Sequence, residues 1–372
     1  MKQLTLIITA AFLFGICFTT FAQPAKAPEN IWQEPWEGVP EHYQKWEYPD
    51  FEFPAKLSDW KKERIGVREK LVELLGDIPP RPKPQKVTIE YHVTREGYTL
   101  EKFWIDNGTD ALIPGYLAIP TNVKGPVPAV LGLHGHSSSK DNIFSTNPSS
   151  QAVLALLISH GYAVMAIDSY YNGERRGKGP AGTREMQSRD VDQERSLFKL
   201  HLWFGRSLWG MQIRDEQIAL DYLSSRPEID KDRIGAEGMS MGSTRAWWLA
   251  AVDDRIKAVV GVACFTRYKE LIEQRYLRSH GIYYFVPGML KHFDTEAVMG
   301  LIAPRPFLAL TGDSDRGSPL SGMKTLEKKL DTIYSLYGKK ENFKSIIYPN
   351  TGHVYNDDMK LKMLQWFDKF LK

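Results

Sequence analysis

The chain has 372 residues, 42% of them hydrophobic and 25% charged, a composition typical of a globular protein with a sizeable core. Its 48 basic and 45 acidic residues leave a net charge of +3, which is too balanced to favour nucleic acid or an anionic membrane surface as a partner. The length allows one large domain or two modest ones.

Residues 1–22 are predicted to be a secretory signal peptide of bacterial type. Lys2 supplies the positive charge, residues 4–18 form an apolar stretch that is too short to span a bilayer comfortably, and small residues at 20 and 22 mark a cleavage site. We therefore expect a secreted or periplasmic protein with no membrane contact after signal removal. A retained membrane anchor is the alternative.

The two cysteines of the chain fall on either side of this cleavage site. Cys17 would be removed with the signal peptide, and Ile16 stands where a lipid anchor on Cys17 normally needs a small residue. Cys264 would then be alone, so no intrachain disulfide is expected. Its apolar surroundings favour a buried thiol over a second nucleophile.

Residues 23–86 are predicted to be an N-terminal extension that packs on a main domain of residues 87–372. The segment is rich in Pro, Trp, Glu and Lys, and a helical stretch at 60–75 is followed by a stiff proline-rich run at 79–84. Packing is favoured over sugar stacking for its four tryptophans. They are Trp32, Trp36, Trp46 and Trp60.

From residue 87 onward, short apolar runs predict strands that alternate with helices. The first three, at 87–91, 100–105 and 112–119, are typical of antiparallel strands that open a sheet. The later runs are continuously apolar, which is typical of parallel strands covered on both faces. They lie at 128–133, 162–167, 233–238, 257–265, 306–312 and 344–348, with helices expected at 152–158, around 218–223 and at 363–371.

Residues 238–242 read Gly-Met-Ser-Met-Gly, between an apolar run at 233–236 and a helix-capable run at 245–251. A strand, a sharp turn and a helix around G-x-S-x-G form the nucleophile elbow of α/β-hydrolases. Only glycine fits the two flanks of such a turn without a Cβ clash. The pattern predicts Ser240 as a nucleophile, and an ordinary Gly-rich turn is the alternative.

A serine nucleophile needs a base and an acid that orients the base, in the chain order Ser, Asp or Glu, His. Asp313 and Asp315 follow a predicted buried strand, and we favour Asp315 as the acid, with Asp313 forming the turn. His353, in the loop before the last helix, is the base candidate because it alone among nine histidines lies downstream of the acid. A surface-loop histidine is the alternative for His353.

The oxyanion hole needs two backbone N–H groups. One is expected from Met241, directly after the nucleophile, and the other from His136 in the loop after the 128–133 strand. His134 and His136 could instead form a metal-binding pair, but no further ligand cluster follows at a suitable spacing. We expect neither a metal nor another cofactor.

Two segments are candidates for the substrate pocket. Residues 169–204 make a long connection that carries Arg175 and Arg176, and residues 267–291 carry Tyr283 and Tyr284. Arginines and aromatic rings suit uronic carboxylates and sugar rings. Aromatic packing and structural ion pairs are an equally open interpretation.

Short motifs lie at 134–136, 172–175, 238–242, 303–306, 312–315 and 352–353. Through these motifs the chain from residue 87 to 372 resembles the dienelactone-hydrolase and acetylxylan-esterase-like branch of the α/β-hydrolases. The resemblance implies an α/β-hydrolase fold with a mostly parallel sheet between helices. It also implies ester hydrolysis, often of substituents on plant polysaccharides, by secreted bacterial enzymes.

The chain also departs from several relatives. Dienelactone hydrolases have cysteine where this chain has Ser240, glucuronoyl esterases have arginine where it has Met241, and prolyl-oligopeptidase-type enzymes carry a propeller for which the extension is too short. We therefore expect a serine carboxylic-ester hydrolase with a carbohydrate ester as substrate, most simply an acetyl(xylan) esterase. A methylesterase acting on pectic uronic acids is the alternative within this class, and a non-catalytic binding protein is the alternative outside it. The acyl group, the sugar and the oligomeric state stay open.

Overall fold

The computed structural model describes residues 48, 50–109, 111–145, 151–177, 182 and 190–372. The predicted signal peptide and three tryptophans of the extension, Trp32, Trp36 and Trp46, lie outside these residues.

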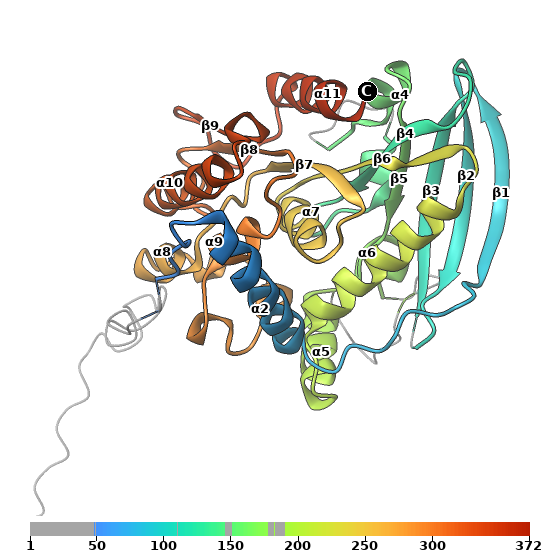
Figure 1. Ribbon diagram of the computed structural model, residues 1–372. Coiled ribbons are helices and arrows are strands. Elements are labelled where there is room, and N and C mark those ends of the chain that lie inside the picture. The colour runs from blue at the N-terminus through green and yellow to red at the C-terminus, as the bar shows by residue number, and fades with distance from the viewer. Residues whose placement is uncertain (1–47, 49, 110, 146–150, 178–181, 183–189) are drawn as a thin grey trace, which may run out of the picture. The chain divides into compact units, whose positions relative to one another are not determined.

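A nine-stranded sheet crosses the described part of the chain in the order β1-β2-β3-β5-β4-β6-β7-β8-β9 (Figure 1). The pairs β1/β2, β2/β3 and β3/β5 are antiparallel, and every later pair is parallel. This arrangement confirms the predicted antiparallel opening and the mostly parallel sheet. The strands are β1 (Val87–Arg95), β2 (Tyr98–Asp106), β3 (Leu112–Pro120), β4 (Val127–Leu133), β5 (Ala163–Ile167), β6 (Ile229–Met239), β7 (Ile256–Val262), β8 (Phe307–Gly312) and β9 (Phe343–Tyr348).

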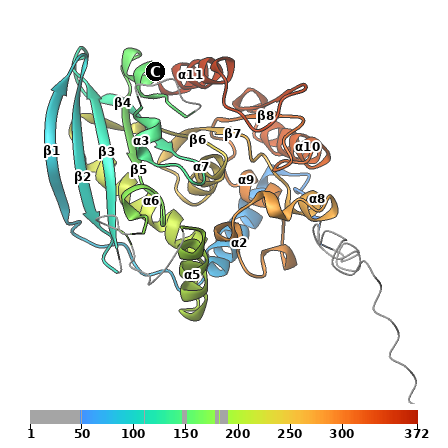
Figure 2. The same ribbon diagram turned by 180° about the vertical axis from the view of Figure 1, so that it is seen from behind.

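Helices cover both faces of the sheet, because its central strands are apolar on both sides. Every residue of β4 and β5 is buried. One face packs against α4 (Leu154–Ser159) and α11 (Asp357–Leu371). The other packs against α6 (Leu208–Ser225), α7 (Met241–Val252) and α10 (Leu320–Leu336), as Figures 1 and 2 show from opposite sides. The fold is that of an α/β-hydrolase.

The remaining helices differ in length. They are α2 (Leu57–Leu75), α3 (Lys140–Ile143), α5 (Asp190–Trp203), α8 (Tyr268–Glu273), α9 (Thr295–Gly300) and the 3-10 turns η1 (Gly173–Arg175), η2 (Leu277–Ser279), η3 (Ile282–Tyr284), η4 (Met289–Lys291) and η5 (Lys340–Asn342). The long connection expected at 169–204 thus contains η1 and α5.

Helix α2 lies in the segment predicted to be an N-terminal extension, and it packs through aromatic and polar contacts. Trp60 is fully buried, and its ring meets Phe53 edge-on at 4.9 Å between centroids. Arg64 donates to the carbonyl oxygen of Leu301 at 2.8 Å. Trp60 therefore serves as a packing anchor, and the described part of the extension is attached to the rest of the fold.

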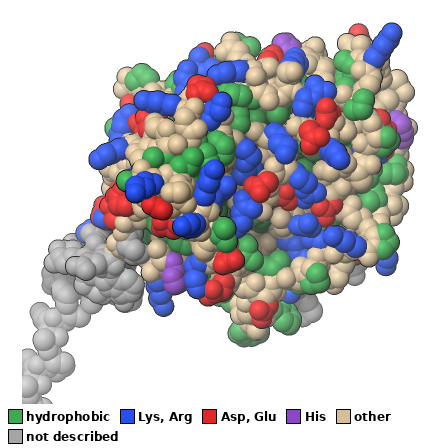
Figure 3. Space-filling model, in the orientation of Figure 1, with side chains coloured by type: hydrophobic (Ala, Val, Ile, Leu, Met, Phe, Trp, Pro, Cys, Tyr) green, Lys and Arg blue, Asp and Glu red, His purple; other side chains and the backbone are tan. Residues whose placement is uncertain are grey.

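The surface carries charges of both signs. Figure 3 shows basic and acidic side chains interspersed on the face seen in Figure 1, in keeping with the net charge of +3. Among the described residues, no helix is both long and apolar enough to cross a bilayer.

Candidate active site

A cavity of about 490 Å³ lies where the parallel strands end. Because the carboxyl ends of parallel strands share one edge of the sheet, loops that are far apart in the sequence meet there. Two hollows of about 960 and 640 Å³ lie against α2 and α5 and contain none of the predicted catalytic residues. The smaller cavity is lined by His136, Ser240, Cys264, Ser279, His280, Gly281, Tyr283, Ser314, Asp315, Arg316, Gly317 and His353.

Ser240 stands in a strained turn between β6 and α7. Its φ is 60° and its ψ is −122°, a backbone conformation that residues other than glycine rarely adopt. Its N–H donates to the carbonyl oxygen of Val262 at 2.8 Å, which ties the turn to β7. A Cβ on Gly238 or Gly242 would collide with the carbonyl oxygen of Leu133. Close backbone packing thus explains both flanking glycines.

Asp315 and His353 meet in the loops after β8 and β9. Oδ2 of Asp315 lies 2.8 Å from Nδ1 of His353, and its Oδ1 accepts the N–H of Gly317 at 2.8 Å. A carboxylate can only accept, so Nδ1 carries the proton and Nε2 of the neutral ring keeps its lone pair. The hydrogen bond to Asp315 raises the pKa of His353 above its usual 6.5, against the opposing effect of burial.

Asp313 has a different set of contacts. Its Oδ1 accepts the hydroxyl of Ser314 at 2.9 Å and the N–H of Thr351 at 3.3 Å. These bonds connect the loop after β8 to the loop that carries His353 and depress the pKa of Asp313. The structure thus brings Asp315, and not Asp313, to the histidine.

One predicted oxyanion donor, Met241, directly follows Ser240, and the other, His136, lines the same cavity as Ser240. Met241 is the first residue of α7, where backbone N–H groups have no partner in their own helix and the helix dipole favours negative charge. His136 lies in the loop after β4 and lines the cavity. Within the described residues, neither N–H donates to a protein acceptor. Their catalytic role stays a prediction.

The His134 ring has no lone pair left for a metal. Its Nε2 accepts the N–H of Ser169 at 3.1 Å, and its Nδ1–H therefore donates to the carbonyl oxygen of Gly135 at 2.8 Å. Complete burial keeps its pKa well below 6.5. Nε2 of His136 pairs with Glu194 of α5 at 2.8 Å. These bonds fix the loop that presents the His136 N–H.

Arg245 of α7 bonds to the loop after β4 that carries His134 and His136. It donates to the carbonyl oxygen of His134 at 3.1 Å and, through Nε, to the buried Glu216 of α6 at 2.7 Å. Both charged groups are buried, and Arg245 bonds to Oε1 of Glu216, whereas Oε2 of Glu216 has no hydrogen-bond partner among the described residues. Arg245 thereby connects α7 to α6 and to the loop after β4.

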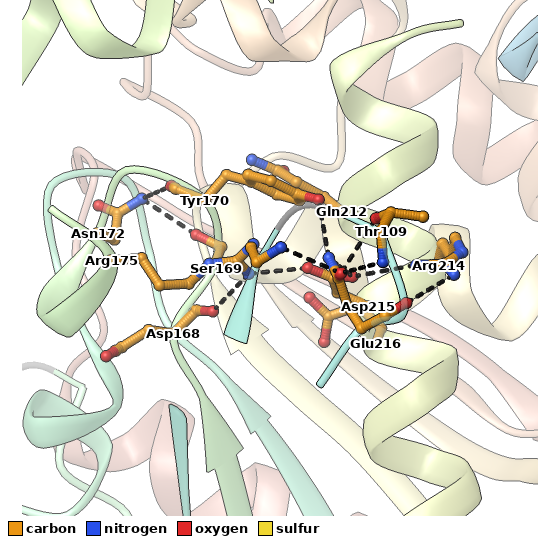
Figure 4. Close-up of polar contacts among 12 residues, drawn as sticks. Thr109, Asp168, Ser169, Tyr170, Asn172, Arg175, Gln212, Arg214, Asp215 and Glu216 are labelled. Carbon is orange, nitrogen blue, oxygen red and sulfur yellow. Dashed lines mark hydrogen bonds and ion pairs between the residues drawn. The ribbon is translucent and has the colours of Figure 1, made fainter. Parts of the chain in front are cut away.

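The two arginines predicted to bind substrate do not line the cavity. Arg175 is buried, donates to Asp215 at 2.8 Å and lies 3.8 Å over the ring of Tyr170, as Figure 4 shows for the surrounding polar network. Arg176 is exposed and also lies outside the cavity lining. The position of Arg175 favours the alternative of a structural ion pair. Arg316 is the arginine that does line the cavity.

The two predicted tyrosines differ in position. Tyr283 lines the cavity, and its N–H donates to Oε1 of Glu194 at 3.2 Å. Tyr284 is buried behind the wall and stacks on His280. His280 lies in the 267–291 segment that was predicted to cover the pocket, and it lines the cavity as well. Sequence reasoning missed the cavity positions of Cys264 and Arg316 because no motif marks them. Burial raises the pKa of the Cys264 thiol to about 12.

Residues 39–347 match the Abhydrolase family, so the chain belongs to that family. It is 36% identical over 83% of its length to the whole of "Putative hydrolase YtaP" of Bacillus subtilis. The fold resembles the crystal structure of "a putative acetyl xylan esterase" from Bacteroides fragilis, with a TM-score of 0.70 and 18% identity over 87% of this chain and 92% of that one. It also resembles "Methylesterase BT1017", with a TM-score of 0.61 and 19% identity over 85% of this chain and 65% of that one.

These matches place the chain among the α/β-hydrolases, and the protein is an enzyme of the hydrolase class. The family match begins at residue 39, so it includes much of the N-terminal extension as well as the sheet.

Proposed function

We propose that the protein is a serine esterase with Ser240, His353 and Asp315 as its catalytic triad. The observation that carries this proposal is the 2.8 Å contact between Asp315 and His353 beside the same cavity as the strained Ser240. The contact leaves Nε2 of the imidazole as the base, which a serine hydroxyl requires.

The reaction follows from these positions. Ser240 attacks the ester carbonyl while Nε2 of His353 takes its proton, and Asp315 stabilises the imidazolium that forms. The N–H groups of Met241 and His136 hold the tetrahedral oxyanion. His353 then returns the proton to the leaving alcohol, and water cleaves the acyl-enzyme with the same base.

The substrate we favour is an acetylated hemicellulose such as xylan. The polar lining of the cavity suits a sugar ester, and a protein of the same fold bears the name of an acetyl xylan esterase. A methyl ester of a pectic uronic acid is the second candidate. It is supported by Arg316 at the cavity, since an arginine can pair with the carboxylate of a neighbouring uronic acid.

The proposal includes export. We propose that residues 1–22 are removed as a signal peptide, that residues 23–86 form an extension on the catalytic domain of residues 87–372, and that the enzyme acts outside the cytoplasm. The apolar stretch at 4–18 and the small residues before Gln23 support this placement.

The test is product release from two polymers. Wild type and Ser240→Ala would be incubated with acetylated xylan and with methyl-esterified pectin, and acetate and methanol would be measured. Acetate from wild type alone supports the proposal as stated, and methanol alone moves the substrate to pectic esters. If neither product depends on Ser240 and p-nitrophenyl acetate is also untouched, the serine esterase proposal fails and a binding protein is favoured.

A further inference from the structure

His280 lines the cavity and is held there in one orientation. It stands between η2 and η3, and its ring stacks on that of Tyr284 with 4.2 Å between centroids and 14° between planes. Its Nε2 lies 2.9 Å from the carbonyl oxygen of Gly317, two residues after Asp315. The ring can therefore neither rotate nor flip without losing a contact.

These contacts determine which nitrogen carries the proton. A carbonyl oxygen can only accept, so Nε2 is the N–H of the His280 ring. Burial lowers the pKa of His280 to about 4, so the ring is neutral at ordinary pH and Nδ1 keeps a lone pair. Within the described residues, no hydrogen-bond donor reaches Nδ1.

Nδ1 of His280 can accept a hydrogen bond, and because His280 lines the cavity, a ligand bound there can supply the donor. Ser240, Asp315 and His353 line the same cavity, so a bound ester lies near His280. Carboxylic esters have no donor of their own, so the donor must come from another group on the substrate. Partly acylated sugars carry such a group, a free hydroxyl beside the ester.

We propose that Nδ1 of His280 accepts a hydrogen bond from a free hydroxyl next to the scissile ester, and that the enzyme thereby selects partly acylated sugars. The inference rests on the proposed serine esterase and specifies its substrate class. A site built to pair with a hydroxyl discriminates against an analogue that lacks it, because the acceptor is then left unpaired. We expect a preference of about tenfold in kcat/KM, the effect of one neutral hydrogen bond.

The test compares kcat/KM for two substrates in wild type and in one variant. The substrates are methyl 2-O-acetyl-xylopyranoside, with a free 3-hydroxyl, and its 3-deoxy analogue. The variant is His280→Phe, which keeps a ring to stack on Tyr284 and removes both nitrogens. Wild type should prefer the hydroxyl substrate about tenfold in kcat/KM, and the variant should lose this preference. The ratio is informative even if the variant is slower on both substrates.

His160→Phe is the matched control, because His160 is exposed at the end of α4, away from the cavity, and its ratio should equal that of wild type. If His280→Phe does not fold, His280→Leu takes its place, because leucine has no hydrogen-bond acceptor, and it should also lose the preference. Equal kcat/KM of wild type for the two sugars, or an unchanged ratio in the folded variant, overturns the inference. Failure of wild type to hydrolyse either sugar or p-nitrophenyl acetate would instead refute the proposed function.

Discussion

Asp315 bonds to His353 with one carboxylate oxygen and to the N–H of Gly317 with the other, both at 2.8 Å. The bond from Gly317 holds the carboxylate in its own loop. The carboxylate can therefore hold the imidazole of His353 in one orientation. Only 5% of Asp315 is exposed, so water competes little for either oxygen. Two loops that lie 38 residues apart in the sequence are thereby joined at the candidate site.

Replacing Asp315 by Asn should lower kcat by about 10⁴, because the amide no longer fixes the tautomer or stabilises the imidazolium. Asp313→Asn is the matched variant, since Asp313 contacts Ser314 and Thr351 but not His353. Its kcat should fall less than about tenfold. Steady-state hydrolysis of p-nitrophenyl acetate measures both, and the reverse ranking would contradict the assignment of the acid.

The activity should fall on the acid side with an apparent pKa above 6.5. The base must be neutral, and the bond to Asp315 raises the pKa of His353 by favouring its charged form. Activity is therefore lost as the pH falls through this raised value. In Asp315→Asn the acid limb should move to lower pH, because the amide stabilises the imidazolium less. An unmoved limb in profiles of kcat/KM against pH would contradict this explanation.

Glu237 of β6 should make the fold less stable as the pH rises. Burial raises its pKa from 4.5 to about 8, and Tyr355 donates to it at 3.2 Å. Between these two pH values the unfolded chain releases a proton that the folded chain keeps. The free energy of unfolding should therefore fall by about 1.4 kcal/mol for each unit that the pH rises in this range.

Glu237→Gln removes that titration and keeps an acceptor for Tyr355. Its advantage over wild type in the free energy of unfolding should therefore grow from pH 5 toward pH 8. The control is Glu63→Gln, at an exposed position of α2, which should show no such trend. Urea unfolding at several pH values measures the difference, and parallel curves for wild type and Glu237→Gln would refute the prediction.

Gly242→Ala should impair folding and activity together. The new Cβ would collide with the carbonyl oxygen of Leu133, so β4 or the serine turn has to shift. We expect a Tm lower by several degrees and at least a tenfold loss of kcat/KM for p-nitrophenyl acetate. Gly66→Ala is the control, because Gly66 lies in α2 with nothing within 4 Å of its added Cβ. It should stabilise the fold by about 0.5–1 kcal/mol. Retention of full activity by Gly242→Ala would contradict the close packing.

The strands were predictable from the sequence because their apolar runs are continuous. The run at 128–133 became β4 (Val127–Leu133), and the run at 344–348 became β9 (Phe343–Tyr348). Helix α10 was not predicted, although its buried residues Met323, Leu326, Leu330 and Ile333 recur at helical spacing. That signal was present in the sequence and could have predicted the helix.

The cavity wall was harder to predict than the fold. Arg175 was expected near substrate, but its partner Asp215 lies 40 residues further along the chain, and no local pattern reveals the pairing. His280 has no motif around it, and its place beside Asp315 depends on how the 267–291 segment folds over the sheet. A sequence motif identifies residues that lie close together in the chain. The walls of the cavity come from segments far apart in the chain, so no motif identifies them.

Labelling with a fluorophosphonate, followed by mass spectrometry of the peptides, tests directly whether Ser240 is the catalytic nucleophile. Such reagents phosphonylate a serine only where a base activates it. We expect one label per chain, on Ser240, with esterase activity falling in proportion to the fraction labelled, and no label on the Ser240→Ala variant. A label on another residue, or full esterase activity in Ser240→Ala, would contradict it.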